Sequence, residues 1–345
     1  LHLVNYSIPV KKELSLEELD KHLYSLPDQP DAIPYVTSYY NPRWGFCITD
    51  NQRKGLKEGA YTVNIDSSIE DGSLSYADLL IKGETEKEIL ISTYTCHPSM
   101  ANNELSGPVL ATFLAKWLLE QNDRKYSYRI VFVPETIGAV AYLSRHLEKM
   151  KKNTIAGFVL TCVGDNRSYS YMPSRKGGLL ADKVALHVLN KKIKGYKEFS
   201  FLDRGSDERQ YCAPGVDLPV CSIMRSKYGE YPEYHTSHDN LSLVSPDGFQ
   251  GSFETHIDLF KIFEANHKYV ATILCEPQLG KRNLRSTLGA GKGLASEFQN
   301  ISNFLAYADG QSDLVDIANT LDVYALDLLP IVAKLLENGL IKSLN

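Results

Sequence analysis

The hydrophobic pattern along the chain changes twice, and its first stretch, residues 1–75, is typical of short strands. Runs such as LHLVNYSIPV and GAYTVNIDSS alternate or are rich in Tyr and Thr, and prolines separate them. β-Branched and aromatic residues favour strands, whereas proline interrupts the hydrogen-bond ladder of a sheet. The segment SLEELDKHLYSL, which starts with a serine, has instead the period of a short capped helix. We therefore expect a small β-rich unit over residues 1–75.

Between residues 76 and 280 the pattern becomes an alternation of strands and helices. Apolar runs such as EILISTYT, RIVFVPE, FVLTCVGD and LPVCSIMR predict buried strands. The segments GPVLATFLAKWLLEQ, AVAYLSRHLEKM and ADKVALHVLNK have a helical period, and SFETHIDLFKIFEANHKYVATIL (252–274) predicts a closing helix. This alternation predicts an α/β fold, with a mostly parallel sheet and helices on both of its faces.

The last stretch, residues 281–345, is predicted to contain a linker and short helices. The segment EPQLGKRNLRSTLGAGKG is a Gly- and Lys-rich linker, and three segments of helical period follow, separated by turns that contain glycine. An Asn-Gly turn and a short apolar strand end the chain. This order is typical of a reduced winged-helix module.

Composition and charge narrow the classes of function. Hydrophobic residues make up 43% and charged residues 23% of the 345 residues, as in ordinary globular proteins. The formal net charge of -5 at pH 7 is too small to indicate a nucleic-acid or membrane partner. No apolar run is long enough to span a bilayer. The oligomeric state stays open, a homo-oligomer included.

The six cysteines indicate a reducing compartment. They show no paired CxxC spacing, and several lie in apolar segments such as FVLTCVGD and LPVCSIM. Free buried thiols fit a cytoplasmic protein better than a disulfide scaffold. The chain shows no signal peptide, but it opens with LHLVNYSIPV and without an initiator Met, which leaves room for an upstream segment.

Side chains that can bind a metal gather at the predicted carboxyl ends of the strands. Four strand ends carry them: His97 and Glu104, then Glu135, then Asp165, and finally His235. Ligands bind at these ends in an open α/β sheet, and imidazole and carboxylate are zinc ligands. Each residue alone also has an ordinary structural explanation, such as a core histidine, a helix-start carboxylate or a turn cap. Their joint placement favours a zinc site.

Four motifs appear in an order that resembles a known family. They are HPSMANNELSG, PETIG, GSDERQYCAPGVDLP and YPEYHTSHDN. Together they resemble the zinc aminopeptidase-like branch encoded beside polysaccharide-biosynthesis genes, which is related to the M28 metallopeptidases. The resemblance covers essentially the whole chain. It implies an aminopeptidase-like domain over residues 76–280, with the β-rich unit as an insert domain and a C-terminal winged helix.

The resemblance also implies roles for particular residues. His97 matches the first metal histidine of the family and His235 matches the late one. Glu135 falls on the general base. Asp207 falls on the aspartate of a Ser-Asp-His motif, with Glu208 in place of the histidine.

Three positions depart from the pattern of the peptidases. Asn103 stands where they place the aspartate that bridges two zinc ions, Thr136 replaces a metal-binding glutamate, and Ser99 replaces the aspartate that orients the first histidine. An amide oxygen bridges two cations poorly because it carries no formal charge. Glu104 is therefore expected to supply the missing carboxylate, and Asp165 lies a few residues beyond the family's metal aspartate. One zinc ion is as consistent with these residues as two.

The resemblance implies a zinc-dependent hydrolase, an aminopeptidase or amidohydrolase, in which Glu135 takes the proton of a zinc-activated water. The expected substrate is a small peptide or an acylated amino sugar, with Asp207, Glu208 and Tyr234 as candidate contacts. Tyrosines in such loops also serve as ordinary packing. The alternative function is that of a catalytically impaired metal-binding relative, a binding or assembly protein in polysaccharide biosynthesis.

A DNA-binding regulator is a third hypothesis, because winged helices often bind DNA. Binding to phosphates requires clustered Lys and Arg. From residue 309 to the end the basic residues are Lys334 and Lys342, against an acidic set of Asp309, Asp313, Asp316, Asp322, Asp327 and Glu337. This balance disfavours nucleic acid as a partner.

Overall fold

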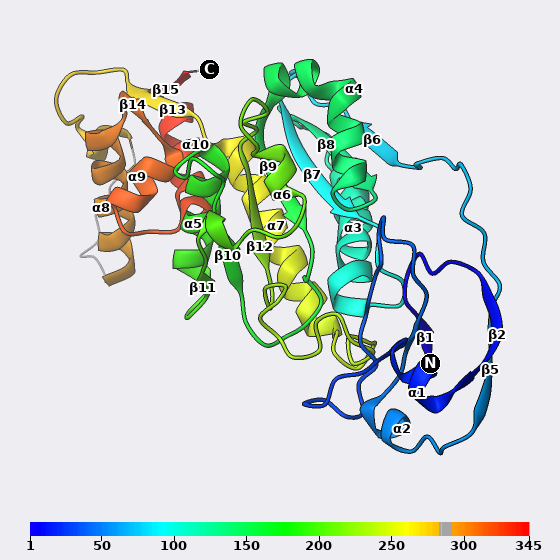
Figure 1. The fold of residues 1–345 in the computed structure, drawn as a ribbon. Helices are drawn as coiled ribbons and strands as arrows, with labels where there is room; N and C mark the ends of the chain where they lie inside the picture. The colour runs from blue at the N-terminus through cyan, green and yellow to red at the C-terminus, as the bar shows by residue number, and fades with distance from the viewer. Residues whose placement is uncertain (283, 285–291, 345) are drawn as a thin grey trace.

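A computed structural model gives the fold of the chain and describes residues 1–282, 284 and 292–344 (Figure 1). Its centre is a seven-stranded sheet with the strand order β11-β10-β12-β9-β7-β8-β6. The strands are β6 (Ala77–Ile81), β7 (Glu88–Tyr94), β8 (Ser127–Val133), β9 (Thr154–Leu160), β10 (Ser170–Met172), β11 (Lys197–Glu198) and β12 (Val220–Met224). Strands β12, β9, β7 and β8 are parallel neighbours, whereas β6 and β10 run antiparallel to β8 and β12. The predicted α/β fold with a mostly parallel sheet is confirmed.

Helices cover both faces of this sheet because its central strands carry apolar side chains on both sides. The helices are α3 (Ser106–Glu120), α4 (Ile137–Asn153), α5 (Leu180–Lys192), α6 (Glu208–Tyr211) and α7 (Pro246–Ala265). In β7, Ile89 and Ile91 pack into one layer with α3, α5 and α7, and Leu90 packs into the other with α4 and α6. The near-continuous apolar run of this strand is therefore explained by burial on both faces.

Helix α3 approaches the sheet closely at its first turn, and this contact fixes the loop that precedes it. A Cβ on Gly107 would lie 2.3 Å from the carbonyl oxygen of Leu160 and 2.3 Å from Thr93 Oγ1, so only glycine fits there. Before α3 comes a π-helical turn, η1 (Ala101–Leu105). Such turns are rare and are frequent at functional sites.

The helix predicted over residues 252–274 ends earlier than expected. Helix α7 begins at Pro246 after the capping residue Ser245 and ends at Ala265. Residues Lys268–Ala271 form the strand β13 instead. The segment KYVA pairs with strands on both of its sides, and this pairing overrides the helical period.

The N-terminal part forms two small sheets around its own apolar core. The elements are β1 (His2–Leu3), β2 (Val10–Ser15), α1 (Leu16–Asp20), β3 (Leu23–Tyr24), β4 (Phe46–Cys47), α2 (Asp50–Lys54) and β5 (Ala60–Ile65). Strands β1, β4 and β3 make one sheet, and β2 pairs with β5 in the other. The core includes Leu14, Leu19, Trp44 and Val63. The capping serine predicted for the first helix is Ser15, which forms a capping box with Glu18.

The C-terminal part packs short helices against a three-stranded sheet of order β14-β13-β15. Its further elements are η3 (Leu279–Arg282), α8 (Lys292–Tyr307), β14 (Asp309–Asp313), α9 (Leu314–Thr320), η4 (Ala325–Leu328), α10 (Leu329–Glu337) and β15 (Ile341–Leu344). Figure 1 shows this part, in orange and red, on the opposite side of the central sheet from the blue N-terminal part.

The limits of the three predicted units, 1–75, 76–280 and 281–345, stay predictions. Within the predicted linker over residues 276–293, positions 283 and 285–291 lie outside the described residues. Within the described segments, no helix is long and apolar enough to cross a membrane.

Candidate functional site

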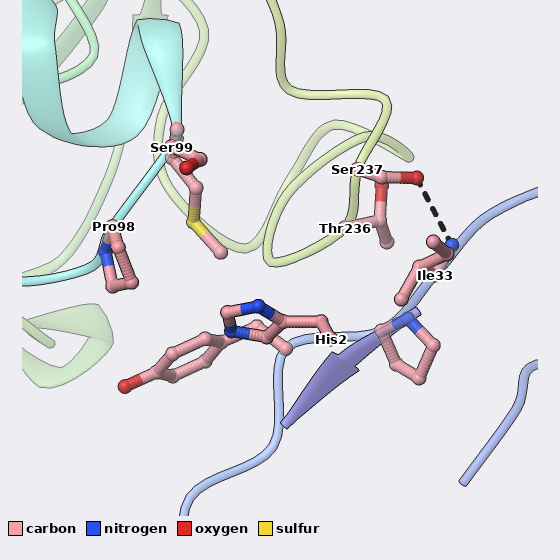
Figure 2. A pocket seen from close by; sticks show the side chains of 9 residues that line it. His2, Ile33, Pro98, Ser99, Thr236 and Ser237 are labelled. Carbon is pink, nitrogen blue, oxygen red and sulfur yellow. Dashed lines mark hydrogen bonds between the residues drawn. The ribbon is translucent and has the colours of Figure 1, made fainter. Parts of the chain in front are cut away.

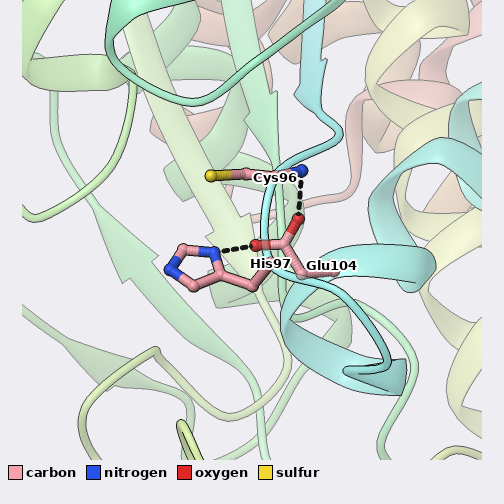
Figure 3. Close-up of side chains that lie close together, drawn as sticks. All are labelled: Cys96, His97 and Glu104. Atoms are coloured by element: carbon pink, nitrogen blue, oxygen red, sulfur yellow. Dashed lines mark hydrogen bonds and ion pairs between the residues drawn. The ribbon is translucent and has the colours of Figure 1, made fainter. Parts of the chain in front are cut away.

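His97 lies three residues beyond β7 and is held by Glu104 of η1. Glu104 Oε1 accepts a hydrogen bond from His97 Nδ1, and Glu104 Oε2 accepts one from the backbone N–H of Cys96 at 2.8 Å (Figure 3). Both side chains are buried. Because Nδ1 carries the proton of this bond, Nε2 is the ring atom left to bind a metal. Glu104 is thus placed to orient His97. In the family that the chain resembles, an aspartate at the position of Ser99 has this role.

His235 comes from the loop after β12 and lies beside His97. The ring centroids of the two histidines are 4.6 Å apart, and Tyr35 of the N-terminal part contacts both rings edge-on. His235 Nε2 is buried and has no hydrogen-bond partner among the described residues. Its backbone has a φ of 55°, which is unfavourable for a histidine. The ring of Tyr234, predicted to contact substrate, stacks on His235 with 3.9 Å between centroids.

Asn103 presents an amide oxygen without a donor. It is buried in η1, and its Nδ2 donates to the Tyr94 hydroxyl at 3.0 Å. Its Oδ1 has no partner within the part of the chain that the structure describes. A neutral amide oxygen can bind one cation but bridges two poorly.

The structure does not bring Asp165 into the group that contains His97. Its buried Oδ1 accepts hydrogen bonds from the Ser226 hydroxyl at 2.8 Å and the Arg167 N–H at 3.0 Å. Its Oδ2 accepts from the Ser226 N–H at 2.9 Å and from Asn102 Nδ2 at 3.0 Å. A carboxylate offers about four lone-pair sites, and these donors occupy them. Asp165 therefore braces the loops after β9 and β12.

Glu135 lies at the end of β8 in a strained turn. The Ile137 N–H donates to the Glu135 carbonyl at 2.7 Å, and Thr136 between them has a φ of 62° and a ψ of -72°. This is a γ-turn with a positive central φ, a rare form that is unfavourable for a β-branched residue. Asp207 Oδ1 accepts the Thr136 N–H at 2.6 Å, and Arg209 donates to the Thr136 hydroxyl at 2.7 Å. Contacts from a neighbouring loop thus hold the turn in place.

Burial and neighbouring charges set the ionisation of these groups. Burial raises the pKa of Glu135 to about 6; the charge on His97 opposes this rise and the charge on Glu104 adds to it. Burial disfavours the charged form of His97, but hydrogen bonds with Cys96 and Glu104 outweigh it and raise the pKa of His97 to about 10. Burial, together with the charge of His97, lowers the pKa of His235 to about 4. The neutral ring of His235 is the form that binds metals.

Asp207 and Glu208, predicted to contact substrate, are completely buried. Glu208 Oε1 accepts hydrogen bonds from the backbone N–H groups of Gly205 and Ser206 and from the Tyr228 hydroxyl. Asp207 Oδ2 and Glu208 Oε2 have no partner among the residues described. Burial raises the pKa of Asp207 well above its usual range. Because solvent does not reach these carboxyl groups, they have structural partners instead: Asp207 supports the turn at Thr136, and Glu208 holds the Gly205–Ser206 loop and Tyr228.

A pocket of about 120 Å³ (Figure 2) is lined in part by Tyr35, whose ring contacts both histidines. Ile33 and Tyr35 of the N-terminal part form one wall, and Pro98 and Thr236, the neighbours of the histidines, form another. The two walls are joined by a hydrogen bond of 3.0 Å from the Ile33 N–H to Ser237 Oγ. The N-terminal part therefore contributes to the site.

Comparison with known proteins places the chain in a family without an assigned activity. Residues 3–266 match the family model described as a domain of unknown function (DUF4910). Residues 267–343 match a winged helix-turn-helix model, which confirms the predicted module. A protein of Clostridium acetobutylicum, provisionally named a polysaccharide biosynthesis protein with an aminopeptidase-like domain, is 45% identical over 319 residues. These cover 92% of this chain and 73% of that protein.

Solved structures extend the likeness to the fold. A crystal structure from Clostridium acetobutylicum, provisionally named a peptidase, matches with a TM-score of 0.92 and 42% identity over 100% of this chain and 78% of that one. BSAP, a zinc aminopeptidase from Bacillus subtilis, matches with a TM-score of 0.53 and 14% identity over 70% of this chain and 63% of its own. The second match shows a shared aminopeptidase-like fold.

Proposed function

The chain belongs to the family described as a domain of unknown function (DUF4910), and we propose that it is a zinc-dependent hydrolase of amide bonds. One observation carries the proposal: His97, oriented by Glu104, lies 4.6 Å from the ring of His235, whose buried Nε2 has no partner among the described residues. Both histidines follow parallel strands at the end of the sheet where α/β enzymes bind ligands. One ion, rather than two, agrees with the neutral Asn103 and the occupied Asp165.

The residues of the site divide the chemistry between them. A zinc ion held here would lower the pKa of its water to about 7 and polarise the scissile carbonyl. Glu135 takes the proton of the attacking water and returns it to the leaving amine. Its pKa of about 6 suits a base that works near neutral pH. The γ-turn at Thr136, anchored by Asp207 and Arg209, holds the backbone that carries Glu135.

The proposed substrate is a small peptide or an acylated amino sugar. The pocket that Tyr35 lines is small, and its walls are largely apolar side chains such as Ile33, Pro34 and Met100. It would admit a methyl-bearing acyl group or a short aliphatic side chain. The name of the relative from Clostridium acetobutylicum, which refers to polysaccharide biosynthesis, is the support for an amino sugar.

Zinc content tests this proposal directly. Elemental analysis of untagged protein is expected to give one zinc ion per chain, and His235→Ala is expected to lower the zinc content because it removes a ligand. The matched control is His238→Ala, three residues along the same loop and exposed, which should retain zinc. Protein without zinc after incubation in excess zinc would remove the basis of the hydrolase.

A second function is favoured by two positions in particular. Asn103 and Thr136 lack the carboxylates that would complete a two-metal site, as expected of a relative that binds a metal without catalysis. Such a protein would serve in binding or assembly during polysaccharide biosynthesis. A screen of aminoacyl amides and N-acylated amino sugars with the zinc-loaded chain separates the two functions, since turnover of any amide excludes a purely binding role.

A further inference from the structure

Cys96 is an exposed thiol next to the first histidine of the site. It lies two residues beyond β7, and its backbone N–H is held by Glu104. One potential ligand atom from each of Cys96, His97 and Glu104 lies within 4.8 Å of the others. Figure 3 shows the Cys96 sulfur and the outer ring nitrogen of His97 on the same side, away from the Glu104 carboxylate. The thiol and the outer ring nitrogen thus lie on one side of the Glu104 carboxylate.

Cys96 would give the proposed metal site an anionic ligand that is free to turn toward the ion. His235 and Asn103 bind as neutral groups, and His97 does so once it releases its second ring proton. Each oxygen of Glu104 already accepts a hydrogen bond. Zinc accepts thiolate ligands readily, and catalytic sites combine three protein ligands with one open position. We infer that Cys96 is a thiolate ligand of the metal, beside His97. The thiol proton passes to solvent when the metal binds.

A second exposed thiol gives the inference a matched control. All six cysteines lie in the described part of the chain as free thiols; Cys96 and Cys275 are exposed, and the other four are buried. Among the residues searched, Cys275 belongs to no group of three potential ligands. Metal binding should therefore change the reactivity of the Cys96 thiol and leave that of the Cys275 thiol unchanged.

Cobalt is the probe, because Co²⁺ takes zinc sites and reports its ligands by absorption. In the full chain loaded with Co²⁺ alone, we expect visible d–d bands and a near-ultraviolet thiolate-to-cobalt charge-transfer band. Cys275→Ser should keep both features. Cys96→Ser should lose the charge-transfer band while the histidines preserve d–d absorption, and circular dichroism checks that it folds.

The outcomes separate this inference from the proposed function on which it rests. Cobalt d–d bands without a charge-transfer band in the wild-type chain would overturn the role of Cys96 and leave the hydrolase standing. Failure to take up either Co²⁺ or Zn²⁺ would overturn both.

Thiol labelling of the wild-type chain supplies a test that needs no variant. After chelation of metals, Ellman's reagent is expected to react with the two exposed thiols, Cys96 and Cys275. Added zinc should protect Cys96 and leave Cys275 reactive, as peptide mapping would show. Equal labelling of Cys96 with and without bound zinc would contradict the inference.

Discussion

Glu135 is the residue whose replacement separates catalysis from metal binding. Glu135→Gln keeps the shape of the side chain, but the amide cannot accept a proton from water. Loss of general base catalysis lowers rates by roughly 10²–10⁴-fold. We therefore expect the turnover number on an amide found in the screen to fall by this factor, with zinc content near that of the wild type.

Two results would revise the role of Glu135. Loss of zinc from the Gln variant would make Glu135 a ligand, in place of the carboxylate that Thr136 lacks. Unchanged turnover would leave the mechanism without a base. Arg145→Gln, on the exposed side of α4, is the control for substitution at a charged residue outside the site.

At this scale the sequence predicts which residues reach the site better than what each one contacts. His97, Glu135 and His235 follow parallel strands, and strand order alone brings their ends together. Asp165 also follows such a strand, but its donors come from Ser226 and Asn102, whose positions depend on loop conformation. The groups that bind a carboxylate on a loop depend on how distant segments pack together, and spacing along the chain does not predict this.

The turn between β8 and α4 is the element that carries strain. Thr136, at its centre, has a φ of 62°, and glycine is the residue that tolerates such a backbone. A strained non-glycine residue costs roughly 1–3 kcal/mol, against roughly 0.5–1 kcal/mol for the extra entropy of an unfolded glycine. Thr136→Gly should therefore exceed Thr136→Ala in free energy of unfolding by about 1 kcal/mol.

Urea unfolding of the two variants checks this prediction. Both lose the hydroxyl that Arg209 contacts, so the comparison isolates the backbone. In an ordinary helix or strand the alanine variant is the more stable one. The same order here would show that the turn stores no strain.

Elements with one dominant signal are predicted well, and elements that depend on distant partners are not. The buried strands and α3 follow from apolar runs and helical period. Strand β13 was assigned to a helix because KYVA continues the period of α7. Its partners, β14 and β15, lie 39 to 76 residues further along the chain by their register, from Val270 with Asp309 to Lys268 with Leu344. Local pattern carries no information about such pairing.

At the scale of the whole molecule, acidic side chains of the winged-helix part form ion pairs with the central domain. Asp313 and Asp316 pair with Lys183 of α5 at 2.7 and 2.6 Å, and Asp322 pairs with Lys191. These acidic side chains would repel the phosphates of DNA. Here they form ion pairs that hold the winged-helix part against the central domain. Apolar side chains of the winged-helix part belong to the same hydrophobic core as those of the central sheet, so the two parts pack together.

This arrangement leads to a prediction about DNA. Binding to phosphates requires basic side chains that displace counterions, and from residue 309 to the end acidic residues outnumber basic ones. We expect duplex DNA to bind no tighter than about 10⁻⁶ M at physiological salt, without sequence preference. Fluorescence anisotropy with several duplexes measures this, and a tight, sequence-specific complex would show that the charge argument fails.

His187 is a buried contact between α5 and the winged-helix part, and it makes their association sensitive to pH. The Ala325 N–H donates to His187 Nε2 at 2.9 Å, so the proton of the neutral ring is on Nδ1, which donates to Asn319 Oδ1 at 2.6 Å. A second proton on Nε2 would break the bond to Ala325. Burial, together with the charge of Lys191, lowers the pKa of His187.

Because the native state resists this proton and the unfolded chain accepts it near pH 6.5, acid favours unfolding. The stability that depends on neutral His187 is complete above about pH 6.5 and is lost as the pH falls through the lowered native pKa.

His187→Gln keeps a neutral acceptor and donor at similar positions and does not titrate. We expect the free energy of unfolding, measured in urea at about pH 7.5 and about pH 5.5, to fall less in His187→Gln than in the wild type. The remaining histidines titrate in both proteins, so their contributions cancel in this difference. Equal losses in the two proteins would mean that His187 stays neutral, or is freely protonated, in both the folded and the unfolded chain.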